Sequence, residues 1–286
     1  MQIIDAHLHF SAVKRFINCA SKISKENYSV EGLEQLLVNN NIVYAVGMGI
    51  EETSNKAFPD HLQSNPMGLD LNEQLPSKIR CCIGINPMSL KKNFKTEIKK
   101  IIESLKSIKV IGIKLYPGYY PVSVTDPIYE HIFELAKEYQ VPIVIHCGKT
   151  YAIKGYLNES HPLNVNQVAL RNPSVKFIIA HLGDPWVMDT AAIISNNDNV
   201  YADLSGLIVG DEKAINKRST KYFVEHIQRA LDYANSYDKI LYGSDWPLVT
   251  MEYYIDWIKQ LIPSVYHKKV FFDNALNVYS GLKIYI

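Results

Sequence analysis

The 286-residue chain contains little cysteine and has no excess of charge of either sign. Its four cysteines, at positions 19, 81, 82 and 147, show no Cys-x-x-Cys spacing, which argues against a disulfide framework or a cysteine-based zinc site. We expect buried free thiols instead. The 30 basic and 29 acidic side chains nearly cancel. The chain therefore lacks the concentrated positive charge that binding to nucleic acid or to an anionic membrane requires.

Long apolar runs are also absent. No segment approaches the roughly 18 consecutive apolar residues that span a bilayer. Asp5, His7 and His9 interrupt the apolar stretch near the start, so no secretory signal peptide is predicted. With 47% hydrophobic residues the chain is too apolar to be disordered. These features predict a soluble globular protein in the cytoplasm.

Eight short runs rich in β-branched residues recur along the chain. Most are nearly continuous apolar segments, as expected for parallel strands that are buried on both faces. They span residues 3–10, 42–50, 79–87, 110–117, 141–148, 175–183, 200–207 and 240–247. Apolar residues at helical spacing predict helices between them, over 30–40, 95–106, 128–139, 186–195, 221–233 and 253–262.

The alternation of eight strands with helices predicts a (β/α)8 barrel, the TIM barrel fold. Segments 12–29 and 51–76 are less regular and are interpreted as short insertions after the first two strands. No linker or repeat divides the chain, so residues 1–286 are expected to form one domain. The alternative is a doubly wound open sheet, but no G-x-G-x-x-G motif follows any predicted strand.

Polar side chains interrupt the predicted strands near their carboxyl ends. His7 and His9 are two residues apart on the first strand, so their side chains share one face. Four further strands end in a charged or imidazole side chain: Lys114, His146, His181 and Asp245. Barrel active sites are built at the carboxyl ends of strands, so all six side chains can converge. Imidazoles and a carboxylate are suitable ligands for zinc, manganese or iron. For any one of these histidines alone, the alternative is a hydrogen-bonded residue of the core or the surface.

Together these motifs resemble those of the amidohydrolase superfamily. The start Ile-Asp-Ala-His-Leu-His, the Gly-Ser-Asp-Trp-Pro of 243–247 and a tail with Asn274, Ala275, Tyr279 and Leu282 are most similar to its amidohydrolase-2 branch. The resemblance extends from residue 3 to residue 282. That branch contains small metal-dependent hydrolases and lactonases together with non-oxidative decarboxylases.

The resemblance implies roles for the strand-end residues. His7, His9, His146 and Asp245 would be the ligands of the main metal, and Asp245 would also act as the catalytic base. His181 would be either the catalytic histidine that orients substrate or a ligand to a second metal. Lys114 would be either carboxylated and bridge two metals, or cationic and paired with Asp245 or with a substrate carboxylate.

Aromatic and basic residues in the following loops are candidates for binding a small ring-bearing or carboxylated substrate. They are Tyr116, Tyr119, Lys149, Trp186 and Trp246, and for each the alternative is plain packing. Asp203 is equally open between a role in the pocket and a structural role. Asn86 and Pro87 are interpreted as a simple turn of the chain.

The leading hypothesis is a metal-dependent hydrolase that cleaves an amide or lactone bond of a small molecule with a metal-activated water. Zn²⁺ is the expected cofactor, with Mn²⁺ or Fe²⁺ as alternatives, and a homodimer is expected from the resemblance. One alternative function is a non-oxidative decarboxylase that uses the same metal site. Another is a catalytically silent barrel, which would require the loss of a ligand position.

Overall fold

The computed structural model of the protein describes residues 1–11, 14–49, 77–151 and 155–285. The insertion predicted over 51–76 lies outside the described residues. Eight parallel strands are paired in sequence order. They are β1 (Ile3–Leu8), β2 (Ile42–Met48), β3 (Ile79–Gly84), β4 (Val110–Leu115), β5 (Ile143–Ile145), β6 (Phe177–Ile179), β7 (Val200–Asp203) and β8 (Ile240–Leu241). Each strand lies inside one of the eight predicted runs.

The first and last strands come together through backbone hydrogen bonds. Ala6 N donates to Tyr242 O over 2.9 Å, and Asp245 N donates to His7 O over 2.8 Å. Leu8 and Trp246 form a further parallel bridge. The sheet therefore curves round to bring β8 against β1, which confirms the predicted TIM barrel.

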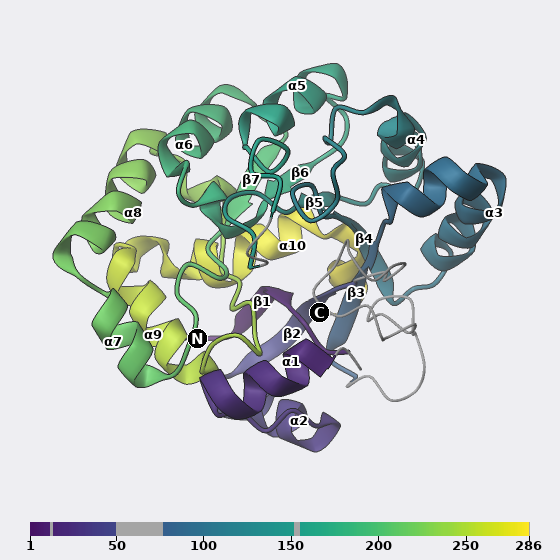
Figure 1. Cartoon of the computed structure of the whole chain (residues 1–286). Coiled ribbons are helices and arrows are strands. Elements are labelled where there is room, and N and C mark those ends of the chain that lie inside the picture. Colours follow the sequence, from purple (N-terminus) through teal and green to yellow (C-terminus); the bar gives the residue numbers. More distant parts are fainter. Residues whose placement is uncertain (12–13, 50–76, 152–154, 286) are drawn as a thin grey trace.

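Helices surround this sheet (Figure 1). They are α1 (Lys14–Cys19), α2 (Val30–Asn39), α3 (Pro87–Leu105), α4 (Glu130–Glu138), α5 (Leu163–Arg171), α6 (Val187–Asn196), α7 (Glu212–Arg218), α8 (Lys221–Ala234), α9 (Met251–Leu261) and α10 (Asn274–Val278). The six predicted helices are present. Sequence periodicity did not predict α1, α5, α7 or α10. Helices α1, α7 and α10 have only 6, 7 and 5 residues, too few to repeat an apolar stripe, whereas α5 is as long as the predicted α4 and was missed. Within the part of the chain that the structure describes, no helix is both long enough and apolar enough to cross a membrane.

Two apolar layers hold the barrel together. The outer layer lies between strands and helices and includes Cys81 and Cys147. The inner layer fills the barrel and includes Cys82, which confirms that adjacent strand residues face opposite sides. All four cysteines are described and buried, and none forms a disulfide, as predicted.

The C-terminal segment closes one end of the barrel. Side chains of α10 and the turn after it, among them Val278 and Tyr279, belong to the inner layer together with Ile4 of β1. The Asn274 side chain donates to the carbonyl oxygens of Tyr237 and Ile240, both over 2.7 Å, and so anchors α10 beside the start of β8. This end is therefore plugged, and the opposite end, where the strands finish, is left for a site.

Helix α3 begins eight residues earlier than predicted. Asn86 caps it, because its Oδ1 accepts hydrogen bonds from the backbone N–H groups of Met88 and Ser89 over 2.9 and 3.2 Å. The interpretation of Asn86 and Pro87 as a simple turn was wrong: they start a helix. Asn93 inside α3 has non-helical dihedrals, φ −138° and ψ 49°. This kink separates the capped first turns from the regular apolar stripe.

We expect Asn86→Ala to lower the free energy of unfolding by about 1 kcal/mol, because two backbone N–H groups lose their acceptor. Chemical denaturation followed by circular dichroism measures this change. Asn93→Ala places the same substitution at an exposed position of the same helix and is expected to shift stability by less than about 0.5 kcal/mol. Equal losses in the two variants would contradict the capping role.

Candidate active site

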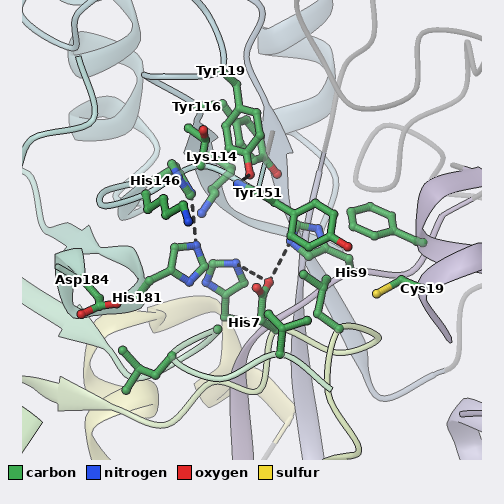
Figure 2. A pocket seen from close by; sticks show the side chains of 18 residues that line it. His7, His9, Cys19, Lys114, Tyr116, Tyr119, His146, Tyr151, His181 and Asp184 are labelled. Carbon is green, nitrogen blue, oxygen red and sulfur yellow. Dashed lines mark hydrogen bonds and ion pairs between the residues drawn. The ribbon is translucent and has the colours of Figure 1, made fainter. Parts of the chain in front are cut away.

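A cavity of about 440 Å³ opens at the carboxyl ends of the strands. All six strand-end side chains predicted to converge line it: His7, His9, Lys114, His146, His181 and Asp245. Figure 2 shows His7 and His9 on one side of this space and Lys114, His146 and the tyrosines Tyr116 and Tyr119 on the other, with the His181 ring between those of His7 and His146. The barrel thus brings residues from five strands into one chamber.

His7, His9 and Asp245 form the tightest group. One potential ligand atom of each lies within 4.8 Å of the other two. Asp245 Oδ1 lies 3.1 Å from His9 Nε2 and 3.6 Å from His7 Nε2. The other nitrogen of His9, Nδ1, lies 3.2 Å from the Met48 carbonyl oxygen, which can only accept a hydrogen bond. His9 Nδ1 is therefore the donor to Met48, and Nε2 is the His9 nitrogen that faces the Asp245 carboxylate.

This arrangement needs a positive charge between its atoms. His7 is fully buried, and burial is the main cause that lowers its pKa to about 3, so its ring is neutral. Its Nε2 has no hydrogen-bond partner among the described residues. Two imidazole lone pairs and a carboxylate oxygen that converge at these distances repel one another unless a proton or a cation lies between them. The donor set of nitrogen and oxygen suits zinc, manganese or iron.

His146 extends the group from the opposite wall. Its Nδ1 lies 3.1 Å from His181 Nε2, and its buried Nε2 has no partner within the described part of the chain. Burial, followed by the neighbouring His181, holds the pKa of His146 well below its usual value. His146 therefore offers a neutral nitrogen to the cavity, although it is not part of the three-residue cluster.

Lys114 stands at the buried floor of the cavity, and none of the described residues forms an ion pair with it. Its Nζ has no hydrogen-bond partner in the described structure and lies 5.2 Å from the centre of the Tyr116 ring. No ion pair joins Lys114 to Asp245 among the described residues, so the structure does not support that predicted pairing. Burial is the largest cause that lowers the pKa of Lys114 to about 8.

A second cluster that could hold a metal comprises His7, His181 and Asp203. Here the atoms already satisfy one another. Asp203 Oδ2 accepts from His7 Nδ1 over 2.9 Å, and Oδ1 accepts from the backbone N–H groups of His181 and Ser205, both over 3.0 Å. Burial acts to raise the pKa of Asp203, but His7, His181 and Lys114 hold it well below its usual value. This cluster supports the first one and does not compete with it for a metal.

Two residues of the site sit in strained backbone. Asp245 and His181 have φ values of 63° and 58°, in the left-handed region that residues other than glycine rarely adopt. Such strain is typical of functional sites. Gly206 lies against both side chains, since a Cβ there would meet Asp245 Oδ2 at 2.7 Å and His181 Nδ1 at 2.8 Å. The close approach requires glycine at this position.

The structure separates the predicted substrate-binding residues into two sets. Tyr116, Tyr119 and Lys149 line the cavity. Trp246 is fully buried away from it and stacks on Tyr28, with ring centroids 5.0 Å apart. Trp186 packs against His161 at 4.6 Å and is not among the residues that line the cavity. The two tryptophans therefore have packing roles in the described structure.

Sequence analysis missed several residues that shape the site. Phe16 and Cys19 of α1 form part of the cavity wall, and Phe16 stacks on His9 with ring centroids 4.6 Å apart. Asp5 accepts hydrogen bonds from His7 N and Ser244 N and from the Ser244 hydroxyl, which ties β1 to the loop that carries Asp245. Burial, opposed by the Ser244 hydrogen bonds, raises the pKa of Asp5 to about 7.

Comparisons with known proteins agree with this architecture. No curated protein matches the chain. Among solved structures, an uncharacterised TIM-barrel protein from Bordetella bronchiseptica is 16% identical with a TM-score of 0.74, covering 99% of this chain and 100% of the other. A probable 2-pyrone-4,6-dicarboxylic acid hydrolase from Acinetobacter baumannii, solved with citric acid bound, is 16% identical with a TM-score of 0.65, covering 98% and 100%.

A third similar structure is the 2,6-dihydroxybenzoate decarboxylase from Rhizobium, 12% identical with a TM-score of 0.68, covering 98% of this chain and 99% of the other. At these identities the likeness shows the fold alone. The family model described as amidohydrolase matches residues 83–281, well over half of the chain. The chain therefore belongs to the amidohydrolase family, in the amidohydrolase-2 branch.

Proposed function

We propose that this protein is a metal-dependent hydrolase that cleaves an amide or lactone bond of a small substrate. The observation that carries the proposal is the convergence of His7 Nε2, His9 Nε2 and Asp245 Oδ1, in which the buried His7 nitrogen has no hydrogen-bond partner among the described residues. We propose Zn²⁺ as the metal and His146 as the fourth ligand through its unpartnered Nε2. Mn²⁺ and Fe²⁺ suit the same donors.

A divalent metal at this centre supplies a Lewis acid and makes a water acidic enough to react at neutral pH. With the metal bound, Asp245 would accept a proton from the attacking water and return it to the leaving group. Despite burial, His9, whose Nε2 lies 3.1 Å away, and the neighbouring histidines hold the pKa of Asp245 low, at about 2, so its side chain is an ionised carboxylate that can accept a proton. His181 also lines the cavity, but both of its ring nitrogens are engaged by protein atoms, so in this arrangement it holds His146 in place.

The cavity wall indicates what kind of substrate fits. Tyr116 and Tyr119 provide aromatic surface beside the proposed metal ligands. The Lys114 ammonium at the buried floor favours binding of an anionic group of the substrate. Lys149 adds a second cation at the exposed rim. We propose a small ring-bearing carboxylate as the substrate, a class that includes the compound named for the Acinetobacter baumannii hydrolase.

The second candidate is a non-oxidative decarboxylase. The unpartnered Lys114 favours it, because a carboxylate drawn to the floor of the cavity lies next to the metal ligands. Hydrolysis and decarboxylation differ in their products. A panel of cyclic amides, lactones and aromatic carboxylates, assayed with the zinc-loaded protein, should give a ring-opened acid for the first function and carbon dioxide for the second.

Elemental analysis of the metal-supplemented protein tests the proposed centre itself. We expect about one Zn²⁺ per chain, unchanged in Lys114→Ala, because the ligand set of His7, His9, His146 and Asp245 provides one metal site that does not include Lys114. Two metals per chain that fall to one in Lys114→Ala would establish a carboxylated lysine bridge instead. Absence of transition metal from the supplemented protein would overturn both enzyme hypotheses.

Other expectations from the sequence stay predictions. They are the organisation of the chain as one domain, the homodimer, the lack of nucleic-acid binding and the cytoplasmic location.

A further inference from the structure

Asp203 and Ser205 lie at the end of β7, behind the rings of His7 and His181 and outside the cavity lining. We infer that these two are positioning residues. They determine which of the two ring nitrogens, Nδ1 or Nε2, carries the proton in His7, His181 and His146. As a result, the Nε2 atoms of His7 and His146 are unprotonated and direct their lone pairs into the cavity. The inference builds on the proposed metal centre, but the proton positions can be measured without metal or substrate.

The first link is between Asp203 and His7. Asp203 Oδ2 lies 2.9 Å from His7 Nδ1, and a carboxylate oxygen can only accept a hydrogen bond. The proton of the neutral ring is therefore on Nδ1. His7 Nε2 is left with a lone pair, and it is the atom that lies 3.6 Å from Asp245 Oδ1.

The second link is the Ser205 hydroxyl, which uses all its hydrogen-bonding capacity. Ser205 Oγ donates its one proton to Asp203 Oδ1, so it can only accept from its other neighbours. Those neighbours are His7 Nδ1 at 3.1 Å and His181 Nδ1 at 2.9 Å. The Ser205 carbonyl oxygen also lies 3.0 Å from His181 Nδ1, and it too can only accept. The proton of His181 is therefore on Nδ1.

The third link passes from His181 to His146. Because His181 Nδ1 carries the proton, its Nε2 accepts the hydrogen bond from His146 Nδ1 over 3.1 Å (Figure 2). His146 Nε2 is then bare, and this buried atom has no partner in the described structure. A single carboxylate and hydroxyl on β7 thus set the orientation of ligands on two other strands. This is the support that metal-binding histidines need from their second nitrogen.

An amide cannot replace the carboxylate in this network. Asp203 accepts four hydrogen bonds, from His7 Nδ1, Ser205 Oγ and the backbone N–H groups of His181 and Ser205. In Asp203→Asn one of the two oxygens becomes an NH₂ donor. The backbone N–H groups cannot move their protons, but the His7 ring can. The amide NH₂ is therefore expected to face His7, which shifts the His7 proton to Nε2, the nitrogen proposed for the metal.

The experiment is two-bond ¹H–¹⁵N correlation of the ¹⁵N-histidine-labelled full chain, which identifies the protonated ring nitrogen, recorded without metal and with one equivalent of Zn²⁺. His7→Gln assigns the His7 signals. We expect the Nδ1–H form for His7, His181 and His146 in the wild type, and the Nε2–H form for His7 in Asp203→Asn. Zn²⁺ affinity, measured against a chromophoric chelator, should fall about tenfold to a hundredfold in Asp203→Asn.

Three further variants make the test specific. Ser205→Ala keeps the carboxylate and should shift the Nδ1–H signals of both His7 and His181, which lose their shared acceptor. Asp184→Asn alters another carboxylate that is hydrogen-bonded to a histidine, His226 at 3.1 Å, at the cavity rim, and should leave Zn²⁺ affinity unchanged. Ser160→Ala removes an equally buried hydroxyl, whose partners are the carbonyls of Gly148 and Leu157, and should also leave it unchanged.

An Nε2–H form of His7 in the metal-free wild type would overturn the inference. So would Nδ1–H signals of His7 and His181 that stay in place in Ser205→Ala, a result that does not depend on the stability of Asp203→Asn. A wild type that shows the expected proton positions but binds no Zn²⁺ would instead overturn the proposed function and leave the positioning role standing.

Discussion

Asp245→Asn is expected to lower kcat by about a thousandfold, the range in which general acid–base groups contribute to catalysis. The amide keeps the size of the side chain but cannot accept the proton of the attacking water. The left-handed backbone of Asp245 is compatible with the change, because asparagine is among the residues that adopt this region most readily. The barrel should therefore stay folded, which circular dichroism and thermal unfolding can verify.

Steady-state kinetics on the substrate found in the product panel, with Zn²⁺ content determined alongside, measure this effect. Asp184→Asn is the matched comparison, because Asp184 is a second aspartate that lines the same cavity, at its rim. Its replacement should alter KM more than kcat. A kcat within tenfold of the wild type in zinc-loaded Asp245→Asn would show that another group takes the proton.

The strand-end residues could be predicted because two simple rules act together. A strand places residues two apart on one face, and parallel strands finish at the same edge of the barrel. These rules were enough to bring His7, His9, His146 and Asp245 into one cavity. They do not fix ring orientation, however. That His146 faces His181 through Nδ1 depends on the left-handed turn at His181, which no sequence pattern indicated.

Other parts of the site carried a signal that was underused. Asp203 and Ser205 are two residues apart at the end of β7, the same spacing as His7 and His9, and the same face argument applies to them. Trp246 shows the opposite case. Its position next to Asp245 suggested the pocket, but the ring packs on Tyr28, in a segment for which sequence periodicity gave no element. Tyr28 lies in the irregular segment 12–29, so no sequence pattern indicated that it would pack against Trp246 and determine the orientation of that ring.

The largest effect on stability is expected from Lys114→Met, measured on the metal-free protein. Lys114 is fully buried, and no hydrogen bond to its Nζ is found in the described residues. Burial lowers the pKa of Lys114 from 10.5 to about 8. At pH 7 the side chain is still a charged ammonium, and this buried charge lowers the stability of the folded protein by about 3 kcal/mol. Methionine has a similar shape without the charge. We therefore expect the free energy of unfolding to rise by about 3 kcal/mol.

The pH dependence separates this cause from a packing effect. Below the folded pKa of about 8, Lys114 is protonated in both states, and the whole penalty is present. Above it the folded state loses the proton while the unfolded state keeps it until its own pKa of 10.5, so the penalty shrinks. The advantage of Lys114→Met, about 3 kcal/mol at pH 7, should fall to about 1 kcal/mol near pH 9.5.

Lys149→Met provides the control, because this lysine lines the same cavity but is exposed at its rim. Its replacement should change stability by less than about 0.5 kcal/mol at either pH. An advantage of Lys114→Met that does not vary with pH would show that packing, and not charge, is responsible. If the expected pH dependence is found, the wild-type fold bears an unpaired buried cation that weakens it. Such a cation is typical of a site kept for binding an anion, since stability alone would favour its replacement.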